Sequence, residues 1–238
     1  MSTERSKSGV RMLRHTQQEP AELVGGDEAL INAISEHIEH HFGPIPTVFH
    51  EIVSPYAHID LHVVVPTEER PAITVVTSGM SERPMANGKY AELMLILPPS
   101  WPTMSDPAFE TDEGYWPYRL LKELARLPHE YGTSLGLGDT VPHGDPPTPY
   151  ARNTKLCGAL IAPMVLPNEE GAEQIVHDGR EIDLLAVWPL HKDEMQVKLD
   201  DGLDRLYDLL DEARITEILH PDRPSVAPKR RRGLFRRP

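Results

Sequence analysis

The chain of 238 residues contains a single cysteine, so we expect no disulfide within it and a reducing compartment. It has no apolar run of about 18 residues, which a membrane-spanning helix would need. Its first residues, MSTERSKSG, are polar and lack the apolar stretch of a signal peptide. These absences predict a cytoplasmic protein. Cys157 lies in the apolar run LCGALIAPMVL, which predicts a buried small side chain rather than a reactive thiol.

Several common catalytic motifs are missing as well. The sequence has no HExxH motif and no paired cysteines, which are usual signs of a zinc site. Residues 77–80 lack the flanking glycines of a nucleophile elbow. Residues 136–138 lack the lysine and the strand-to-helix context of a phosphate-binding loop. We therefore expect no catalytic residues, no cofactor and no small-molecule substrate.

Acidic side chains outnumber basic ones, 37 to 24, and the formal net charge is −13. Six of the 24 cations lie within residues 229–238, so the rest of the chain is more acidic than the total suggests. An acidic body attracts basic partners and is repelled by phosphate backbones. We expect the basic tail, residues 225–238, to be disordered when free and to contact an anionic membrane or nucleic acid weakly.

The spacing of apolar residues predicts one domain over residues 27–224, of the α+β or mixed α/β class. Residues 1–26 are polar and aperiodic, and we expect them to be disordered. Asp27 is the expected N-cap of the first helix, and Pro128 is expected to end the second. Helices are predicted over 28–42, 116–127 and 201–213, and strands within 47–53, 58–66, 72–80, 90–99, 157–166 and 181–189.

One predicted strand, HIDLHVVVP, places His58, Asp60 and His62 on the same face of the sheet. Two imidazoles and a carboxylate at this spacing suit zinc or iron, and a further ligand could come from His143 or Asp145 in the loop PHGDPP. A metal-dependent enzyme that uses His58, Asp60, His62 and the His143 loop is therefore one hypothesis. A polar face that contacts a partner and ordinary packing are the alternatives.

Two predicted helices carry further polar patterns. His37 and His41 share a face, which is ligand spacing, but an exposed polar face explains the pair as well. The last predicted helix has an acidic stripe, which is either a solvated face or a docking surface for a basic partner. The stripe consists of Asp201, Asp204, Asp208 and Asp211.

The turn at 77–80 and the glycine- and proline-rich loop 132–150 form the predicted partner surface. Loops held by a rigid sheet are common binding sites, and Met80 offers an adaptable apolar contact. Gly79 is expected to supply a turn position with positive φ. The partner-binding candidates are Thr77, Ser78, Gly79, Met80, His58, Asp60, His62, Gly138 and His143.

Several separate motifs, in this order, resemble the suppressor-of-fused domain over roughly residues 28–224. They are the turn at 77–80, the helical stretch 121–124 that runs into Pro128, the glycine loop through Gly138, a late EIDLLAVWPLHKDEM and the phrase HPDRPS at 220–225. The resemblance implies a mixed β-sheet flanked by helices in a single α+β domain, with no catalytic activity and no cofactor.

The resemblance also implies protein partners. Animal members bind and sequester transcription factors and carry a second domain, which this chain lacks. Bacterial members stand alone, and the resemblance to them implies an immunity protein that neutralises a toxin of a polymorphic secretion system. The expected function is therefore a non-enzymatic protein-binding module, with another protein, such as a basic toxin domain, as its partner.

Overall fold

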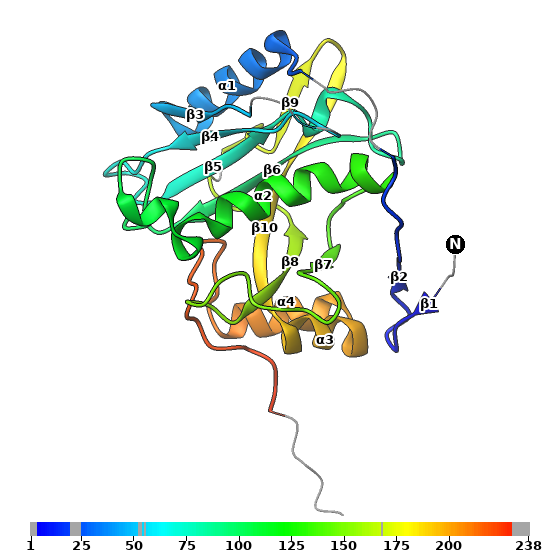
Figure 1. Cartoon of the computed structure of the whole chain (residues 1–238). Coiled ribbons are helices and arrows are strands. Elements are labelled where there is room, and N and C mark those ends of the chain that lie inside the picture. Colours follow the sequence, from blue (N-terminus) through cyan, green and yellow to red (C-terminus); the bar gives the residue numbers. More distant parts are fainter. Residues whose placement is uncertain (1–3, 20–24, 52–53, 55, 168, 230–238) are drawn as a thin grey trace, which may run out of the picture.

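A mixed β-sheet of eight strands forms the centre of the molecule (Figure 1). The structure is a computed structural model that describes residues 4–19, 25–51, 54, 56–167 and 169–229. Along the sheet the strands are β3 (Thr47–Phe49), β4 (Asp60–Val64), β5 (Ile73–Ser78), β6 (Tyr90–Leu97), β10 (Arg180–His191), β8 (Leu156–Ala162) and β7 (Thr140–Pro142), and β9 (Gln174–His177) pairs with β10. The pair β6–β10 is parallel and the other pairs are antiparallel.

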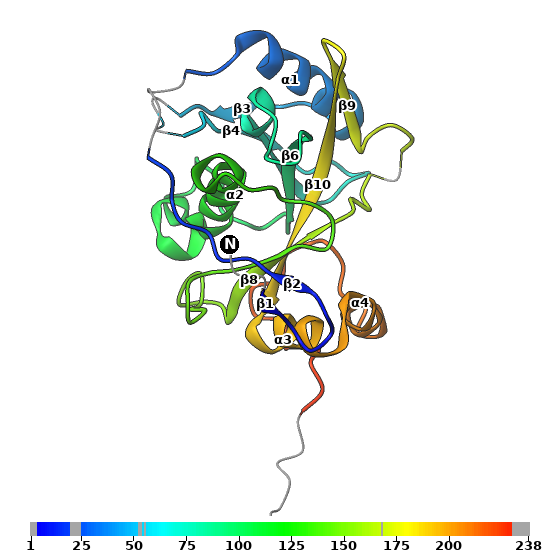
Figure 2. The ribbon, with the colours of Figure 1, turned by 90° about the vertical axis from the view of Figure 1, so that its right-hand side faces the viewer.

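Helices cover both faces of the sheet, which confirms the α+β fold class. Helix α2 (Asp112–Tyr131) packs on one face, and α1 (Glu28–Phe42) packs on the other. The consecutive helices α3 (Lys192–Asp201) and α4 (Leu203–Glu212) pack at the β8 end of the sheet. Figure 2 shows α2 and α4 on opposite sides of the strands. Short 3-10 helices, η1 (Met80–Glu82) and η2 (Pro107–Glu110), lie in the connections.

Helix α1 forms where the sequence predicts it. The carboxylate of Asp27 accepts hydrogen bonds from the backbone N–H groups of Ala29 (3.1 Å) and Leu30 (3.3 Å), and so caps the first turn. A stripe of apolar side chains at helical spacing is fully buried against the sheet. The stripe consists of Leu30, Ile34, Ile38 and Phe42.

Helix α2 is longer than predicted at both ends, because it begins at Asp112 and Pro128 does not end it. Pro128 lacks an N–H, yet its carbonyl accepts a hydrogen bond from the N–H of Gly132, so one more turn follows the proline. Gly132 ends the helix in a left-handed conformation with φ of 58°. Leu120, Leu121 and Leu124 are buried against the sheet, as the spacing predicts.

The C-terminal part of the fold departs most from the prediction. Helix α4 forms within the predicted helix over 201–213, but a further helix, α3, precedes it, and Gly202, where φ is 101°, separates the two. Helix α3 is missed because its sequence, KDEMQVKLDD, is mostly polar. The strands β7 and β9 are also missed, because they contain three and four residues and lie within predicted loops.

The N-terminal segment is not unstructured throughout. A hairpin of β1 (Glu4–Arg5) and β2 (Arg11–Met12) lies beside α3, where Ser8 Oγ donates a hydrogen bond to the Lys198 carbonyl (3.0 Å). The N–H of Gln18 donates to the Glu130 carbonyl at the end of α2 (2.8 Å). Hydrogen bonds therefore tie the stretch 4–19 to the body, and the expected boundary at residue 27 stays a prediction. Residues 1–3 and 20–24 lie outside the described residues.

The start of the basic tail is also bound to the body. Ser225 Oγ donates to the Asp193 carboxylate (2.7 Å), and the N–H of Val226 donates to Glu194 (3.0 Å). Residues 230–238, with five of the six tail cations, lie outside the described residues. Within the part of the chain that the structure describes, no helix is long and apolar enough to cross a bilayer.

Candidate functional site

The polar face of β4 is buried rather than open. Ile59, Leu61 and Val63 belong to the core beneath α2, so the residues between them face the α1 side, as the alternation predicts. Exposure of His58 is 8%, and that of Asp60 and His62 is 0%. These three side chains therefore cannot form an open contact surface in this conformation.

Asp60 is held by three groups around its carboxylate. Its Oδ2 lies 2.9 Å from His50 Nδ1, and its Oδ1 accepts from the N–H of Glu51 (2.8 Å) and lies 3.0 Å from His58 Nε2. A buried carboxylate needs such partners, because an unpaired one is strongly destabilising. The arrangement ties the connection before β4 to the strand.

His62 is a neutral packing residue. Its Nε2 lies 2.9 Å from Ser78 Oγ on β5, and its Nδ1 lies 3.4 Å from Ser35 Oγ on α1. Burial lowers the pKa of His62 to about 4, although the Asp60 charge opposes this shift. The imidazole therefore stays uncharged near neutral pH.

The proposed fourth metal ligand, His143, lies at the other end of the sheet. It follows β7, which is five strands away from β4 in the sheet order, or about 24 Å at the usual strand spacing. Its Nδ1 donates to the Thr148 carbonyl (2.8 Å), and Asp145 lies 3.6 Å from Arg14. Among the described residues, no group of three or more His, Cys, Asp or Glu side chains could hold a metal ion. The geometry gives the metal-enzyme hypothesis no support.

The His37–His41 pair has other contacts. His37 Nε2 donates to the Ala172 carbonyl (3.0 Å), and burial lowers the pKa of His37. His41 Nδ1 lies 3.4 Å from the Glu169 carboxylate. The pair therefore packs α1 against the segment before β9.

The turn at 77–80 is buried as well. Thr77, Ser78 and Met80 have no exposed surface, so their side chains cannot reach a partner in this conformation. Gly79 has a φ of 114°, as predicted, and a Cβ there would lie 1.8 Å from the His58 carbonyl oxygen. We correct the interpretation of these four residues as a contact surface and assign them a structural role.

Glu92 on β6 explains why this turn is buried. Its carboxylate, with 0% exposure, accepts from Thr77 Oγ1 (2.6 Å), Gly79 N (2.9 Å), Ser81 N (2.9 Å) and Ser81 Oγ (2.6 Å). Burial raises the pKa of Glu92, and these hydrogen bonds oppose the rise. Sequence reasoning missed this residue, although a lone glutamate in the apolar run YAELMLIL was the available signal.

Gly138, in the glycine loop, is buried against the C-terminal helices. A Cβ on Gly138 would lie 2.7 Å from a methyl group of Leu203 on α4. The Nζ group of Lys198 donates to the Gly138 carbonyl and to Thr140 Oγ1 (3.2 Å). Burial lowers the pKa of Lys198. All nine predicted contact residues are described by the structure. Eight of them are buried, and His143 is partly exposed.

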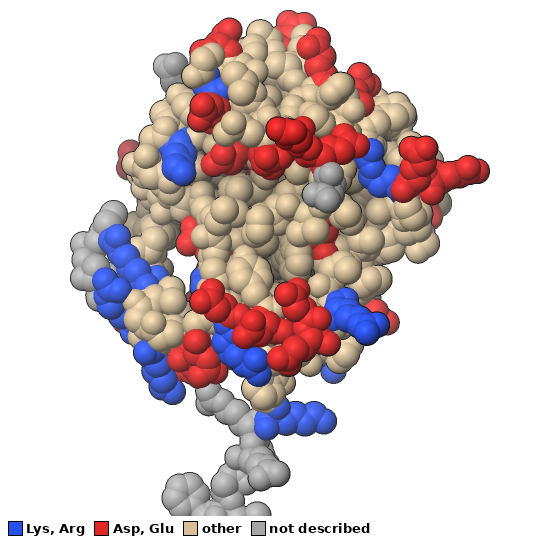
Figure 3. Space-filling view, turned by 180° about the vertical axis from the view of Figure 1, so that it is seen from behind, with Lys and Arg blue, Asp and Glu red and all other residues tan. Residues whose placement is uncertain are grey.

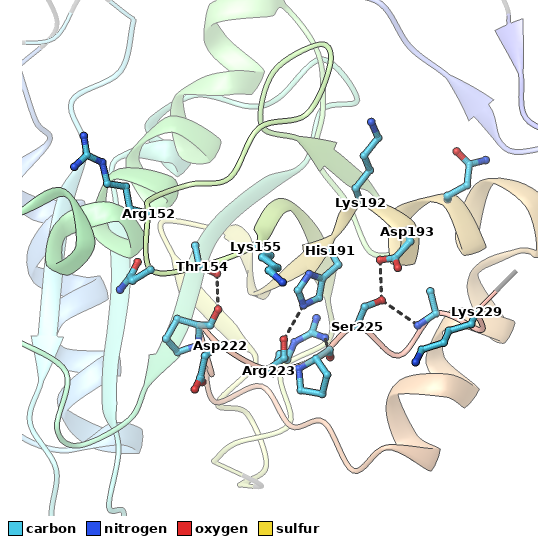
Figure 4. A pocket seen from close by; sticks show the side chains of 15 residues that line it. Arg152, Thr154, Lys155, His191, Lys192, Asp193, Asp222, Arg223, Ser225 and Lys229 are labelled. Carbon is cyan, nitrogen blue, oxygen red and sulfur yellow. Dashed lines mark hydrogen bonds between the residues drawn. The ribbon is translucent and has the colours of Figure 1, made fainter.

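A cleft of about 1080 Å³ opens at the end of the molecule where three segments meet (Figure 4). The segments are the residues before β8, the start of α3, and the C-terminal stretch 221–229. Figure 4 shows Lys155 and His191 between Arg152 and Lys229, at the centre of the cleft. We name this site the C-terminal cleft.

A buried ion pair holds the wall of the C-terminal cleft. Arg223 donates through Nη1 and Nη2 to the two oxygens of Glu194 (2.5 and 2.7 Å), which has 0% exposure. Burial alone would raise the pKa of Glu194, but the hydrogen bonds and charge of Arg223 outweigh it, so the net shift is downward. Arg223 Nη2 also donates to the Pro189 carbonyl (3.0 Å).

Sequence reasoning did not predict the C-terminal cleft. In the sequence, HPDRPS at 220–225 was used only as one of the motifs that resemble the family. Its arginine could have signalled a buried carboxylate partner, but the partner, Glu194, lies 29 residues earlier in the sequence. No local pattern connects the two segments.

The fold and the site therefore define the class of protein. It is an α+β domain with a mixed sheet between helices, a buried polar network and an open charged cleft. The family model of suppressor of fused protein (SUFU) matches residues 55–224, which is more than half of the chain. The chain belongs to the suppressor of fused family. This confirms the resemblance found from the motifs.

Solved structures share this fold. A SUFU homologue from Neisseria gonorrhoeae is 20% identical, with a TM-score of 0.59 over 84% of this chain and 96% of that chain. A chain of the Sufu-Fu complex is 16% identical, with a TM-score of 0.58 over 85% and 93%. Drosophila Suppressor of Fused is 16% identical, with a TM-score of 0.57 over 89% of this chain and 52% of that chain. No curated protein matches the chain in sequence.

Proposed function

We propose that this chain is a non-enzymatic protein-binding module that acts as an immunity protein and neutralises a toxin of a polymorphic secretion system. Membership of the suppressor of fused family is the observation that carries the binding role. A structural relative was solved as the Sufu-Fu complex, which supports a protein as the partner. The immunity role rests on the resemblance to single-domain bacterial members.

Electrostatic attraction supplies the mechanism of this proposal. The net charge is −13, and acidic side chains gather at the end of the molecule that carries α3 and α4 (Figure 3). The predicted stripe is solvent-exposed in the structure, at Asp201, Asp204, Asp208 and Asp211. Such a surface favours encounter with a basic toxin domain, and the bound module would block the working surface of the toxin.

Other parts of the sequence-based hypothesis stay proposals. His143 is a candidate contact of the partner. The boundaries at residues 27 and 224 delimit the proposed binding domain, although the structure also ties residues 4–19 and 225–227 to it by hydrogen bonds. Weak contact of the basic tail with an anionic membrane or nucleic acid is likewise a proposal.

The test is capture of the product of a neighbouring gene by the purified full-length chain, followed by a titration of the complex. We expect binding that weakens as salt is raised, because exposed charges are screened. The triple variant Asp204→Asn, Asp208→Asn and Asp211→Asn should weaken this binding by about tenfold or more, through slower association.

A matched control neutralises three exposed acids on α1, at Glu28, Glu36 and Glu39, and so changes the net charge equally. The control should bind with nearly unchanged affinity. Equal losses in both variants would mean that net charge alone steers the partner. A toxin activity that persists in the fully formed complex would overturn the immunity role.

A further inference from the structure

The C-terminal cleft carries the opposite charge from the rest of the molecule. Four exposed cations line it, and none of them forms an ion pair with any residue that the structure describes. Only two carboxylates line it as well. The cations are Arg152, Lys155, Lys192 and Lys229, and the carboxylates are Asp193 and Asp222. In a chain with a net charge of −13, this excess of cations is a local feature that attracts anions.

The walls of the C-terminal cleft are fixed by buried contacts. Arg223 and Glu194 form the two-pronged ion pair described above, and His191 Nε2 donates to the Arg223 carbonyl (2.9 Å). Thr154 Oγ1 donates to the Pro221 carbonyl (2.5 Å). Because Glu194 neutralises the charge of Arg223, Arg223 positions the wall of the cleft. The four exposed cations are the groups that can contact a ligand. A preformed site loses less conformational entropy on binding.

The placement of the cations favours an extended ligand over a single small anion. Figure 4 shows Arg152 and Lys229 at opposite ends of the cleft, with Lys155 and Lys192 between them. Four charges spread in this way do not converge on one point, as they would around a phosphate ion. The volume of about 1080 Å³ lies just above the usual range of about 300–1,000 Å³ for ligand pockets.

We propose that the C-terminal cleft binds an acidic peptide segment of a partner protein, with several carboxylates along the segment. That the ligand is a protein rests on the proposed function, whereas the charge of the ligand follows from the cleft alone. A long nucleic acid fits less well, because its phosphates would also meet the acidic surface around the cleft. The acidic peptide would therefore bind at a different surface from the acidic stripe, where the basic toxin domain is proposed to bind.

A synthetic peptide tests this directly. The probe is a fluorescently labelled peptide of alternating Glu and Ser, about ten residues long, which spans about 33 Å when extended. Anisotropy is measured with the full-length chain at about 150 mM salt, where the Debye screening length is about 8 Å. We expect a Kd below about 1 mM. Lys155→Glu with Lys192→Glu should weaken binding by about tenfold or more.

Two controls separate the cleft from unspecific attraction. Lys89→Glu with Arg205→Glu changes the net charge by the same amount at exposed positions outside the cleft, and should leave the affinity nearly unchanged. Replacing the tail arginines at 230, 231, 232, 236 and 237 by Gln in the full chain removes their positive charges, and most of the affinity should remain. Thermal melting checks that each variant folds, and Lys155→Gln with Lys192→Gln replaces the double reversal if that variant does not.

Several results would overturn the proposal. They are a Kd above about 1 mM, equal losses in the cleft variant and its matched control, or loss of binding in the tail variant alone. A single-stranded oligonucleotide of equal charge that binds more tightly, and loses its binding in the same lysine variant, would reassign the cleft to nucleic acid. Toxin capture is measured separately, so its failure leaves the peptide result standing, and the reverse also holds.

Discussion

Replacing Glu92 by alanine removes the only described acceptor of two buried backbone N–H groups. Those of Gly79 and Ser81 both donate to Glu92 Oε1, at 2.9 Å, and neither can turn toward another acceptor without moving the backbone. A buried donor without a partner costs about 1–3 kcal/mol, so the pair should cost about 2–6 kcal/mol. This is a large share of the stability of an ordinary domain, about 5–15 kcal/mol.

Glu92→Gln is the informative companion variant. Its amide oxygen can keep the hydrogen bonds made at Oε1, while its NH₂ group replaces Oε2, so Thr77 Oγ1 must accept where it now donates. We expect a smaller loss, below about 2 kcal/mol. Burial raises the pKa of Glu92 above 4.5, so its ionisation weakens the native state as the pH rises from about 4.5 through the raised value. Glu92→Gln should remove that part of the pH dependence.

Urea unfolding followed by circular dichroism measures these changes as free energies of unfolding. Glu181→Ala is the control, because Glu181 is an exposed glutamate on the neighbouring strand β10, and its loss should stay within about 0.5 kcal/mol. If Glu92→Ala costs no more than this control, the turn at 77–80 is not held by the carboxylate. A Gln variant that is less stable than the Ala variant would equally refute the reasoning.

Three further predictions concern stability. Leu124→Ala should cost about 2–5 kcal/mol in urea unfolding, because Leu124 is 3% exposed on the buried face of α2, and a loss under about 1 kcal/mol would mean that this face is misassigned. Gly79→Ala should cost about 3 kcal/mol or more, or prevent folding, because its Cβ would collide with the His58 carbonyl, and a melting temperature near that of the parent would contradict this. Because the pKa of His62 is lowered from 6.5 to about 4, stability should fall by about 3 kcal/mol as the pH drops through this range, and His62→Gln should reduce that slope in pH-dependent urea midpoints.

Local patterns in the sequence determined much of the fold. Helix α1 and its cap at Asp27, the alternation along β4 and the positive φ at Gly79 all follow from residues within a few positions of one another. Such features depend on the periods of helices and strands and on backbone sterics, which a short stretch of sequence displays. The family motifs added the class of fold, because they also occur as short local phrases.

Tertiary contacts decided what each polar residue does. The strand pattern placed His58, Asp60 and His62 on one face, but only the packing of α1 on that face buries them, and only the strand order separates them from His143. Likewise, Pro128 does not end α2: the proline is itself buried, and the helix continues to Tyr131. A proline in the interior of a helix costs about 3 kcal/mol. The packing of α2 on the sheet can outweigh this cost.

The C-terminal cleft was beyond local reasoning altogether. Its cations come from three segments, and the ion pair that fixes its wall joins Glu194 to Arg223 across 29 positions. Contacts between segments far apart in the chain leave no periodic trace in either segment. The sequence by itself determined that acidic side chains outnumber cations, and only the folded chain decided which cations gather, without an ion-pair partner among the described residues, around one cleft.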